Sequence, residues 1–204
     1  MHRTLCICAL IQPCATRTRV VLLLHQLEQE KPTNTGRLAA RCLSNSTIVE
    51  AGSAPAWTVP GADALLLFPH PEARPLEDWR GSPRPIVLVV PDGTWRQAKK
   101  ARRRIAGLDQ LPCATLPAAG PSSYRLRHAA RPDRLATIEA IARALGILEG
   151  PDVQARLDYI FRVMVDRTLW TNGRISTAAV TGGIPPGVRS HDPLGMVNLR
   201  KEVR

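Results

Sequence analysis

A carboxylate, a hydroxyl and an indole stand close together near the middle of the chain, at Asp92, Thr94 and Trp95. A carboxylate can accept a proton or orient an N–H group, and an indole face attracts cations and stacks on nucleobases. Directly after them, Arg and Lys fill most positions between residues 96 and 104. This combination suits a site that acts on a polyanion. Turn formation by Asp92, core packing of Trp95 and a solvated basic face are the structural alternatives.

The sequence on either side of these residues predicts the strand and the helix that position them. Five consecutive apolar residues at 86–90 predict a strand buried on both faces, as in a parallel sheet covered by helices. Pro91 is expected to end this strand, and Asp92-Gly93 to form a tight turn. Thr94, with Gln97 three residues later, predicts a capping box that begins a helix. The junction therefore falls at the carboxyl end of a parallel strand, where open α/β proteins place ligands.

The remaining pattern predicts an α/β fold, a mostly parallel sheet with flanking helices. Further strands are expected at residues 19–25, 46–51, 64–68 and 113–116, and helices at 135–148 and 152–170. Another helix should open near Gly36, with Thr33 or Asn34 as its cap. Residues 1–171 form one predicted domain, and the aperiodic segment 172–204 is expected to be a flexible tail.

The composition is strongly basic. Lys and Arg number 28 against 17 Asp and Glu in 204 residues, a formal net charge of +11. Such a balance favours a polyanionic partner, although an Arg-rich composition could produce much of it without function. No apolar run is long enough to span a bilayer, and no small-residue cleavage site follows the apolar start. We therefore expect a cytoplasmic protein without a membrane partner. The oligomeric state is left open, with a monomer favoured.

The cysteines raise the question of a metal. Their number, five, is odd, which argues against a disulfide framework. Cys6 and Cys8 have the spacing of half a zinc site, whereas zinc normally takes four thiolate or imidazole ligands. His2 or Cys14 could complete a cluster. The ligand count nevertheless favours no stable zinc site, so no metal is expected.

The order Asp92-Gly93-Thr94-Trp95 resembles the signature of the DTW-domain family, the tRNA-uridine aminocarboxypropyltransferases, which are related to the knotted SPOUT methyltransferases. Further blocks follow the family's order at residues 16–25, 34–39, 68–69, 124–127 and 136–140. Members typically carry a Cys-x-x-Cys pair upstream of Cys-x-Cys, and here only the second pair is present, within residues 1–15. The resemblance implies a SPOUT-like fold with a C-terminal, cofactor-binding knot in the loop after residue 116.

The resemblance also implies a reaction. Family members move the 3-amino-3-carboxypropyl group of S-adenosylmethionine onto N3 of a tRNA uridine and release methylthioadenosine. This transfer needs a group near the N3–H proton, correct presentation of the methionine γ-carbon, and a cationic or amide partner for the moving carboxylate. A SPOUT-like RNA methyltransferase and a non-catalytic RNA-binding protein are the alternatives.

Taken with the resemblance, the residues fall into three expected groups. The catalytic residues are Asp92, Thr94 and Trp95, with Asp92 as the base or as the group that orients N3. The residues expected to bind S-adenosylmethionine are Phe68, Pro69, Leu116, Tyr124, Arg125, Arg127, Thr137 and Glu139. The residues expected to contact tRNA are Arg19, Thr35, Gly36, Arg37, Arg96, Lys99, Lys100, Arg102 and Arg103. Ordinary helix capping would explain the residues near Gly36 without any ligand.

Overall fold

The computed structural model describes residues 3–29, 34–50, 61–118, 120–126 and 135–188 of the chain. Within them, six strands form one sheet in the order β2-β1-β5-β3-β6-β4, and every pair is parallel. The strands are β1 (Arg19–Leu24), β2 (Ser46–Glu50), β3 (Asp63–Leu67), β4 (Arg74–Pro75), β5 (Ile86–Asp92) and β6 (Cys113–Thr115). The predicted α/β class with a parallel sheet is confirmed.

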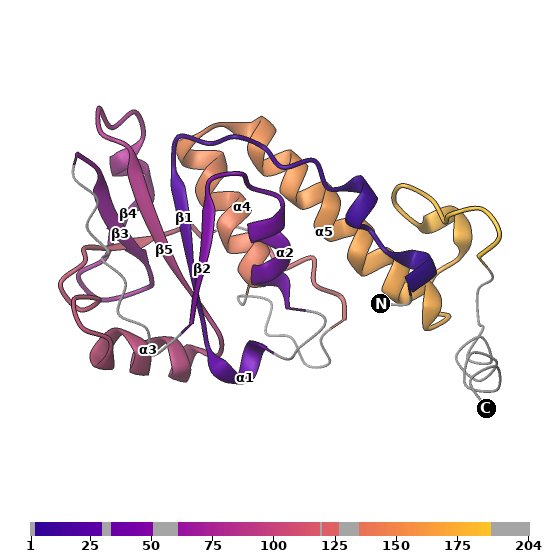
Figure 1. The fold of residues 1–204 in the computed structure, drawn as a ribbon, viewed down its shortest axis with the longest axis horizontal. Coiled ribbons are helices and arrows are strands. Elements are labelled where there is room, and N and C mark those ends of the chain that lie inside the picture. The colour runs from indigo at the N-terminus through magenta and orange to yellow at the C-terminus, as the bar shows by residue number, and fades with distance from the viewer. Residues whose placement is uncertain (1–2, 30–33, 51–60, 119, 127–134, 189–204) are drawn as a thin grey trace.

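Helices cover both faces of the sheet (Figure 1). The α-helices are α1 (Gln26–Gln29), α2 (Thr35–Arg41), α3 (Trp95–Arg104), α4 (Thr137–Leu148) and α5 (Pro151–Thr171), and the 3-10 helices are η1 (Arg3–Leu5), η2 (Cys8–Leu10), η3 (Leu76–Trp79) and η4 (Thr177–Ala179). One core holds Leu22 and Leu88 under α2, α4 and α5, while the other holds Leu23 and Val89 with Ala98 of α3. Alternate side chains of one strand thus enter opposite cores, as a strand buried on both faces requires.

Strand β5 continues two residues beyond its predicted end. Pro91 lies within it, paired with Leu23 of β1. The carbonyl of Asp92 accepts the His25 N–H at 3.2 Å and so faces β1, which turns the missing N–H of Pro91 toward β3. Pairing with β3 stops at Leu66–Val89, so the proline removes no ladder bond there. The extension keeps Asp92 in the strand rather than in a turn.

The described part of the expected tail packs back onto α5. Trp170 Nε1 donates to Thr177 Oγ1 at 3.0 Å, and the backbone N–H and hydroxyl of Thr181 donate to Asp166 Oδ2 at 3.1 and 2.6 Å. Leu5, Trp170 and Val180 form a small apolar cluster that joins this segment to α5 and to the start of the chain. The residues that make these contacts are not spaced with the period of a helix or a strand, so no sequence pattern predicted the packing.

Two further segments differ from, or lie beyond, the sequence pattern. Residues 72–84 hold β4 and η3, two short elements that the sequence pattern did not predict. The expected knot involves the chain after β6, where residues 119 and 127–134 lie outside the described residues, so the knot stays a prediction. No helix in the described part of the chain is both long and apolar enough to cross a lipid bilayer.

Candidate active site at the carboxyl edge of the sheet

Asp92 is the last residue of β5, and its carboxylate lies between the first turns of two helices. Asn34 Nδ2 donates to Asp92 Oδ2 at 2.5 Å, and the Thr137 hydroxyl donates to Oδ1. Asn34 is the N-cap of α2, and Thr137 is the first residue of α4. Asp92 is only 6% exposed. A single buried carboxylate therefore joins the central strand to two helices and fixes this edge of the sheet.

Gly36, in the first turn of α2, allows that helix to approach Asp92 closely. A Cβ at this position would lie 2.9 Å from Asp92 Cγ and Oδ2 and from Leu22 Cδ1. Thr35 and Gly36 are both buried, so packing explains their residue types without a contact to tRNA. Arg37 is exposed, and its backbone N–H donates to Asn34 Oδ1 at 2.7 Å. The expected cap at Asn34 is confirmed.

The carboxylate of Glu139 organises the loop after β6. It accepts the Ser122 hydroxyl at 2.6 Å, the Ser123 N–H and hydroxyl at 2.7 and 2.9 Å, and the Ala136 N–H at 2.7 Å. Glu139 is buried. Four donors around one buried carboxylate occupy most of its acceptor capacity. This arrangement favours Glu139 as the residue that positions the loop, rather than as the partner of a cofactor amino group.

Tyr124 and Arg125 extend from the same loop toward α5. The Arg125 guanidinium pairs with buried Asp166, and the Tyr124 ring packs on Phe161 with 5.5 Å between ring centroids. The Arg125 side chain is 53% exposed, so it also faces solvent. Leu116 packs against the main core, Pro69 is exposed, and Arg127 lies outside the described residues.

Trp95 begins α3, and 49% of its surface is exposed. Its ring lies 6.1 Å from the ring of buried Phe68, which follows β3, and the two planes are tilted by 52°. The alternative that Trp95 is a buried core residue is therefore wrong. An indole supported by Phe68 and open to solvent can stack on a base or face a cation.

Thr94 caps α3, as the sequence predicts. Its Oγ1 accepts the Gln97 N–H at 3.3 Å, and Gln97 Oε1 accepts the Thr94 N–H at 2.6 Å. The reciprocal pair satisfies two amides that the first helical turn leaves without intrahelical partners. The Thr94 hydroxyl therefore has a structural role in this arrangement, at the same edge as Asp92.

Sequence reasoning missed His25 as a site residue. It directly follows β1, and its backbone N–H donates to the Asp92 carbonyl. Its Nδ1 lies 3.2 Å from Gln97 Nε2 and accepts the Leu27 N–H at 3.2 Å. The rule that ligands bind beyond the carboxyl ends of parallel strands could have identified it, since it follows a strand next to β5.

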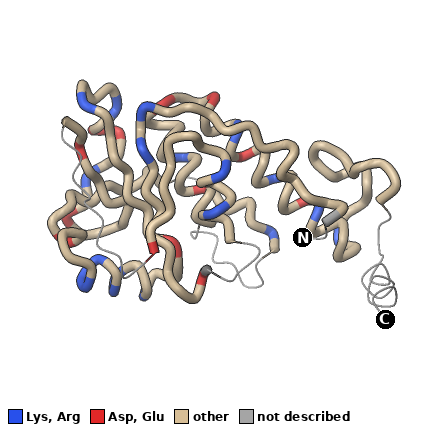
Figure 2. Tube along the Cα trace, viewed as in Figure 1, with Lys and Arg blue, Asp and Glu red and all other residues tan. Residues whose placement is uncertain are grey.

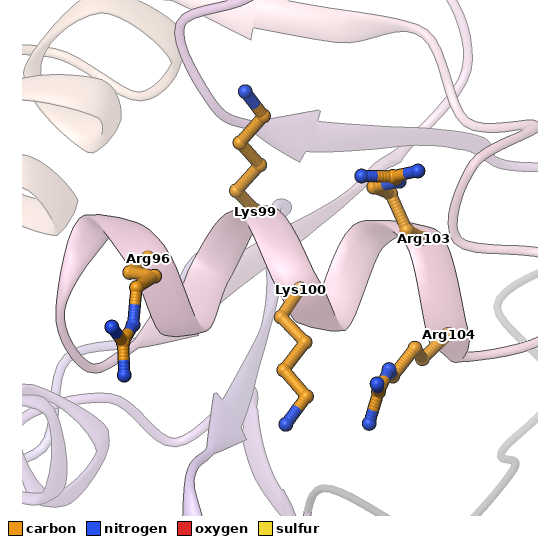
Figure 3. Close-up of a pocket in the computed structure, with 5 residues that line it drawn as sticks. All are labelled: Arg96, Lys99, Lys100, Arg103 and Arg104. Atoms are coloured by element: carbon orange, nitrogen blue, oxygen red, sulfur yellow. The ribbon is translucent and has the colours of Figure 1, made fainter.

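Helix α3 presents a basic outer face (Figures 2 and 3). We define this basic face by the five residues that line a shallow surface hollow of about 430 Å³, namely Arg96, Lys99, Lys100, Arg103 and Arg104. Lys99 and Arg103 extend to one side of the helix in Figure 3, and the other three extend to the opposite side. Four of these were expected to contact tRNA, and Arg104 was missed from the site although it lies in the same run.

Two arginines expected to contact tRNA lie elsewhere. Arg102 faces a different hollow, beside Glu72 and Asp109, and its Nη2 donates to the Asp109 carbonyl at 3.5 Å. Arg19 begins β1, and its Nη2 donates to Thr47 Oγ1 at 3.0 Å. At about 3.3 Å per residue, the length of β1 separates Arg19 from the edge that carries Asp92 by about 17 Å. The structure does not bring either arginine to the basic face.

Cys6 and Cys8 are exposed and close together near the start of the chain. The pKa of Cys6 is lowered, chiefly because the Cys8 backbone N–H donates to its sulfur at 3.4 Å. Cys14 does not join them, because it is buried and its thiol donates to the Cys42 carbonyl at 3.2 Å. Burial raises the pKa of Cys42 to about 11. Among the described residues, no three His, Cys, Asp or Glu side chains gather as metal ligands.

Comparison with known families matches residues 1–169 to the DTW domain. The chain belongs to the DTW-domain family. It is 37% identical over 94 residues to tRNA-uridine aminocarboxypropyltransferase 2 of Drosophila melanogaster, covering 46% of this chain but only 38% of that relative. It is 24% identical over 199 residues to tRNA-uridine aminocarboxypropyltransferase A of Arabidopsis thaliana, covering 79% of this chain and 75% of the relative.

A solved structure shares the fold. The SAM-dependent rRNA:acp-transferase Tsr3 from Vulcanisaeta distributa superposes with a TM-score of 0.51 at 20% sequence identity. The superposition covers 91% of this chain and 95% of that one. At this identity the likeness concerns the fold alone.

Proposed function

We propose that this chain is an S-adenosylmethionine-dependent tRNA-uridine 3-amino-3-carboxypropyltransferase. It would join the aminocarboxypropyl group to N3 of a uridine and leave methylthioadenosine. The observation that carries the proposal is the position of the Asp92–Trp95 signature at the carboxyl edge of a parallel sheet, in a chain that belongs to the DTW-domain family. The names of the Drosophila and Arabidopsis relatives support the same reaction.

The residues at this edge fit such a cofactor. S-adenosylmethionine supplies an electrophilic carbon next to a sulfonium cation, and an exposed indole suits a cation. Trp95, supported by Phe68, offers that indole. The loop held by Glu139 lies at the first turn of α4, where Thr137 contacts Asp92, and it would bind the nucleoside or the methionine end. Arg125 is an exposed cation among the described residues of that loop and could pair with the moving carboxylate.

Asp92 would orient the uridine, because its carboxylate is held in one position. Both of its oxygens already accept a hydrogen bond from Asn34 or Thr137, so its position is fixed. A carboxylate oxygen has two lone pairs, and the remaining one on either oxygen can accept the uridine N3–H. The residue thereby holds the proton that must leave as N3 reacts. The basic face of α3 would bind the tRNA backbone through phosphates.

The test uses S-adenosylmethionine labelled in its carboxyl group, unmodified tRNA transcript and purified protein. We expect label in tRNA, methylthioadenosine as the small product, and a nucleoside with the mass of aminocarboxypropyl-uridine. Trp95→Ala should greatly reduce transfer without loss of folding, since the indole is half exposed. Adenosylhomocysteine as the product would show a methyltransferase instead. Binding of tRNA without either product would show a non-catalytic RNA-binding protein.

A further inference from the structure

We propose that Cys6 and Cys8 form a reversible thiol–disulfide pair, in which Cys6 reacts with peroxides and Cys8 then closes the disulfide. The inference goes beyond the proposed function, because neither thiol takes part in the transfer of the aminocarboxypropyl group. It follows from the geometry of the two thiols, from the cations around them and from the burial of the other three cysteines.

The fold holds the two thiols side by side at the surface. Both cysteines are exposed, whereas Leu5 and Ile7 are buried and anchor the segment. Ile7 bends the chain, with φ −99° and ψ 0°. Two Cα–Cα steps of about 3.8 Å at nearly a right angle leave the Cα atoms of Cys6 and Cys8 roughly 5.4 Å apart, within the range of about 4.4–6.8 Å found in disulfides. Closing the bond therefore requires little movement of the backbone.

Two arginines make the surroundings of the pair electropositive. Arg41 Nη1 donates to Cys8 Sγ at 3.7 Å. Arg167 is 4% exposed, and its Nη1 donates to the carbonyls of Leu5 and Cys6 at 3.2 Å. Within the described part of the chain, no carboxylate forms an ion pair with Arg167, and its Nε has no hydrogen-bond partner. A buried cation without a counter-anion favours a nearby thiolate.

The contacts between the two thiols give each a different role. The Cys8 N–H donates to Cys6 Sγ at 3.4 Å and is the main cause of the lowered pKa of Cys6, and the charges of Arg41 and Arg167 act in the same direction. The pKa of Cys8 is raised, chiefly by the hydrogen bond between its thiol and Cys6. Cys6 is therefore the first of the two to become a thiolate, the form that attacks a peroxide.

The oxidation takes two steps. In the first, the Cys6 sulfur attacks one oxygen of the peroxide, the O–O bond breaks, and hydroxide leaves Cys6 as a sulfenic acid. In the second, the Cys8 sulfur attacks that of Cys6, the S–O bond breaks, and the hydroxyl leaves as water with the proton of Cys8. The two thiols lose two electrons and the peroxide gains them. A thiol reductant such as glutathione restores both thiols by exchange.

The other three cysteines are unsuited to this chemistry. Cys14, Cys42 and Cys113 are all buried. The Cys14 thiol donates to the Cys42 carbonyl at 3.2 Å, and burial raises the pKa of both groups. We therefore expect peroxide to oxidise Cys6 at least about tenfold faster than any of these three in the folded protein.

Hydrogen peroxide and mass spectrometry test the pair in the reduced, purified chain. We expect the loss of two hydrogens, reversed by dithiothreitol. Cys14 lies on the same tryptic peptide, residues 4–17, so fragment ions must place the bond between Cys6 and Cys8 and show a free Cys14. A bond to Cys14, disulfides between chains, or no disulfide at all would overturn the proposal. Stoichiometric zinc that protects both thiols would overturn it as well.

Two serine variants test the separate roles. Cys8→Ser keeps the backbone N–H and a side-chain donor but lacks the second sulfur, so Cys6 should still react, within about threefold of the original rate, and stop as a sulfenic acid that dimedone traps. Cys6→Ser should consume peroxide at least about tenfold more slowly. Equal rates for the two variants, with circular dichroism showing both folded, would refute the assignment. Neither tRNA nor S-adenosylmethionine is present, so the result is independent of the proposed function.

Discussion

Replacing Asp92 by Ala tests how far one carboxylate holds the carboxyl edge together. The change removes the acceptor of the Asn34 amide and of the Thr137 hydroxyl. Asp92 is only 6% exposed, so water does not readily replace that acceptor. A hydrogen bond to a charged group contributes about 1.5–3 kcal/mol, so losing two should lower the free energy of unfolding by about 3–6 kcal/mol. This is a large part of the roughly 5–15 kcal/mol by which domains are stable.

Urea unfolding followed by circular dichroism measures this loss as a lower midpoint at an unchanged slope. Asp63→Ala is the matched control, because Asp63 also lies in a strand and pairs with Arg84 at 2.6 Å. That pair is partly exposed, at 26% and 62%, and should contribute only about 0–1 kcal/mol. Equal midpoints for the two variants would refute the argument that Asp92 joins β5 to both helices.

Three further predictions concern packing, charge and thiols. Gly36→Ala should lower stability by about 1–3 kcal/mol and impair transfer, because its Cβ would lie 2.9 Å from the Asp92 carboxylate. Lys100→Glu with Arg103→Glu should weaken tRNA binding and reduce the slope of log affinity against log salt by about two units. Cys6 should be alkylated fastest among the described cysteines, with a half-maximal rate below pH 9.0, because its pKa is lowered below that value.

Each of these predictions has its own control. Gly120→Ala adds the same methyl group where nothing lies within 4 Å, and should be close to neutral. Arg19→Glu alters one charge at the opposite edge of the sheet and should leave the salt slope nearly unchanged. Cys42 should react only after unfolding, since burial raises its pKa to about 11. Stoichiometric zinc in the purified protein would contradict the expectation that Cys6 and Cys8 hold no stable metal.

The sheet was largely predictable because its strands are short apolar runs that end at recognisable residues. β1 and β5 are buried on both faces, and their sequences contain the consecutive apolar residues that such burial requires. β4 was not predictable, because two residues, Arg74 and Pro75, carry no period. The end of β5 was misplaced for a physical reason as well. Proline breaks a ladder only where its missing N–H would be needed. Here that N–H would face β3, whose pairing with β5 has already ended at Val89.

The centre of the candidate site could be placed in the fold from the sequence, and its surroundings less so. Asp92, Thr94 and Trp95 could be placed at the end of a strand and the start of a helix because a strand and a helix cap leave clear local signals, whereas their roles stay a prediction. The partners of Asp92, Asn34 and Thr137, come from segments 58 and 45 residues away, and such contacts leave no local pattern. The basic run was visible in the sequence, but only the structure separates Arg102 from the face formed by its neighbours.

The segment that packs back on α5 determines how the protein can be shortened. Asp166 and Arg167 are adjacent and both buried, yet they hold opposite ends of the chain. Asp166 accepts from Thr181, and Arg167 Nη1 donates to the carbonyls of Leu5 and Cys6 at 3.2 Å. A version cut at the end of α5 would uncover Leu5 and Trp170 and deprive Asp166 of two donors. A minimal domain for crystallisation or NMR should therefore extend through residue 188.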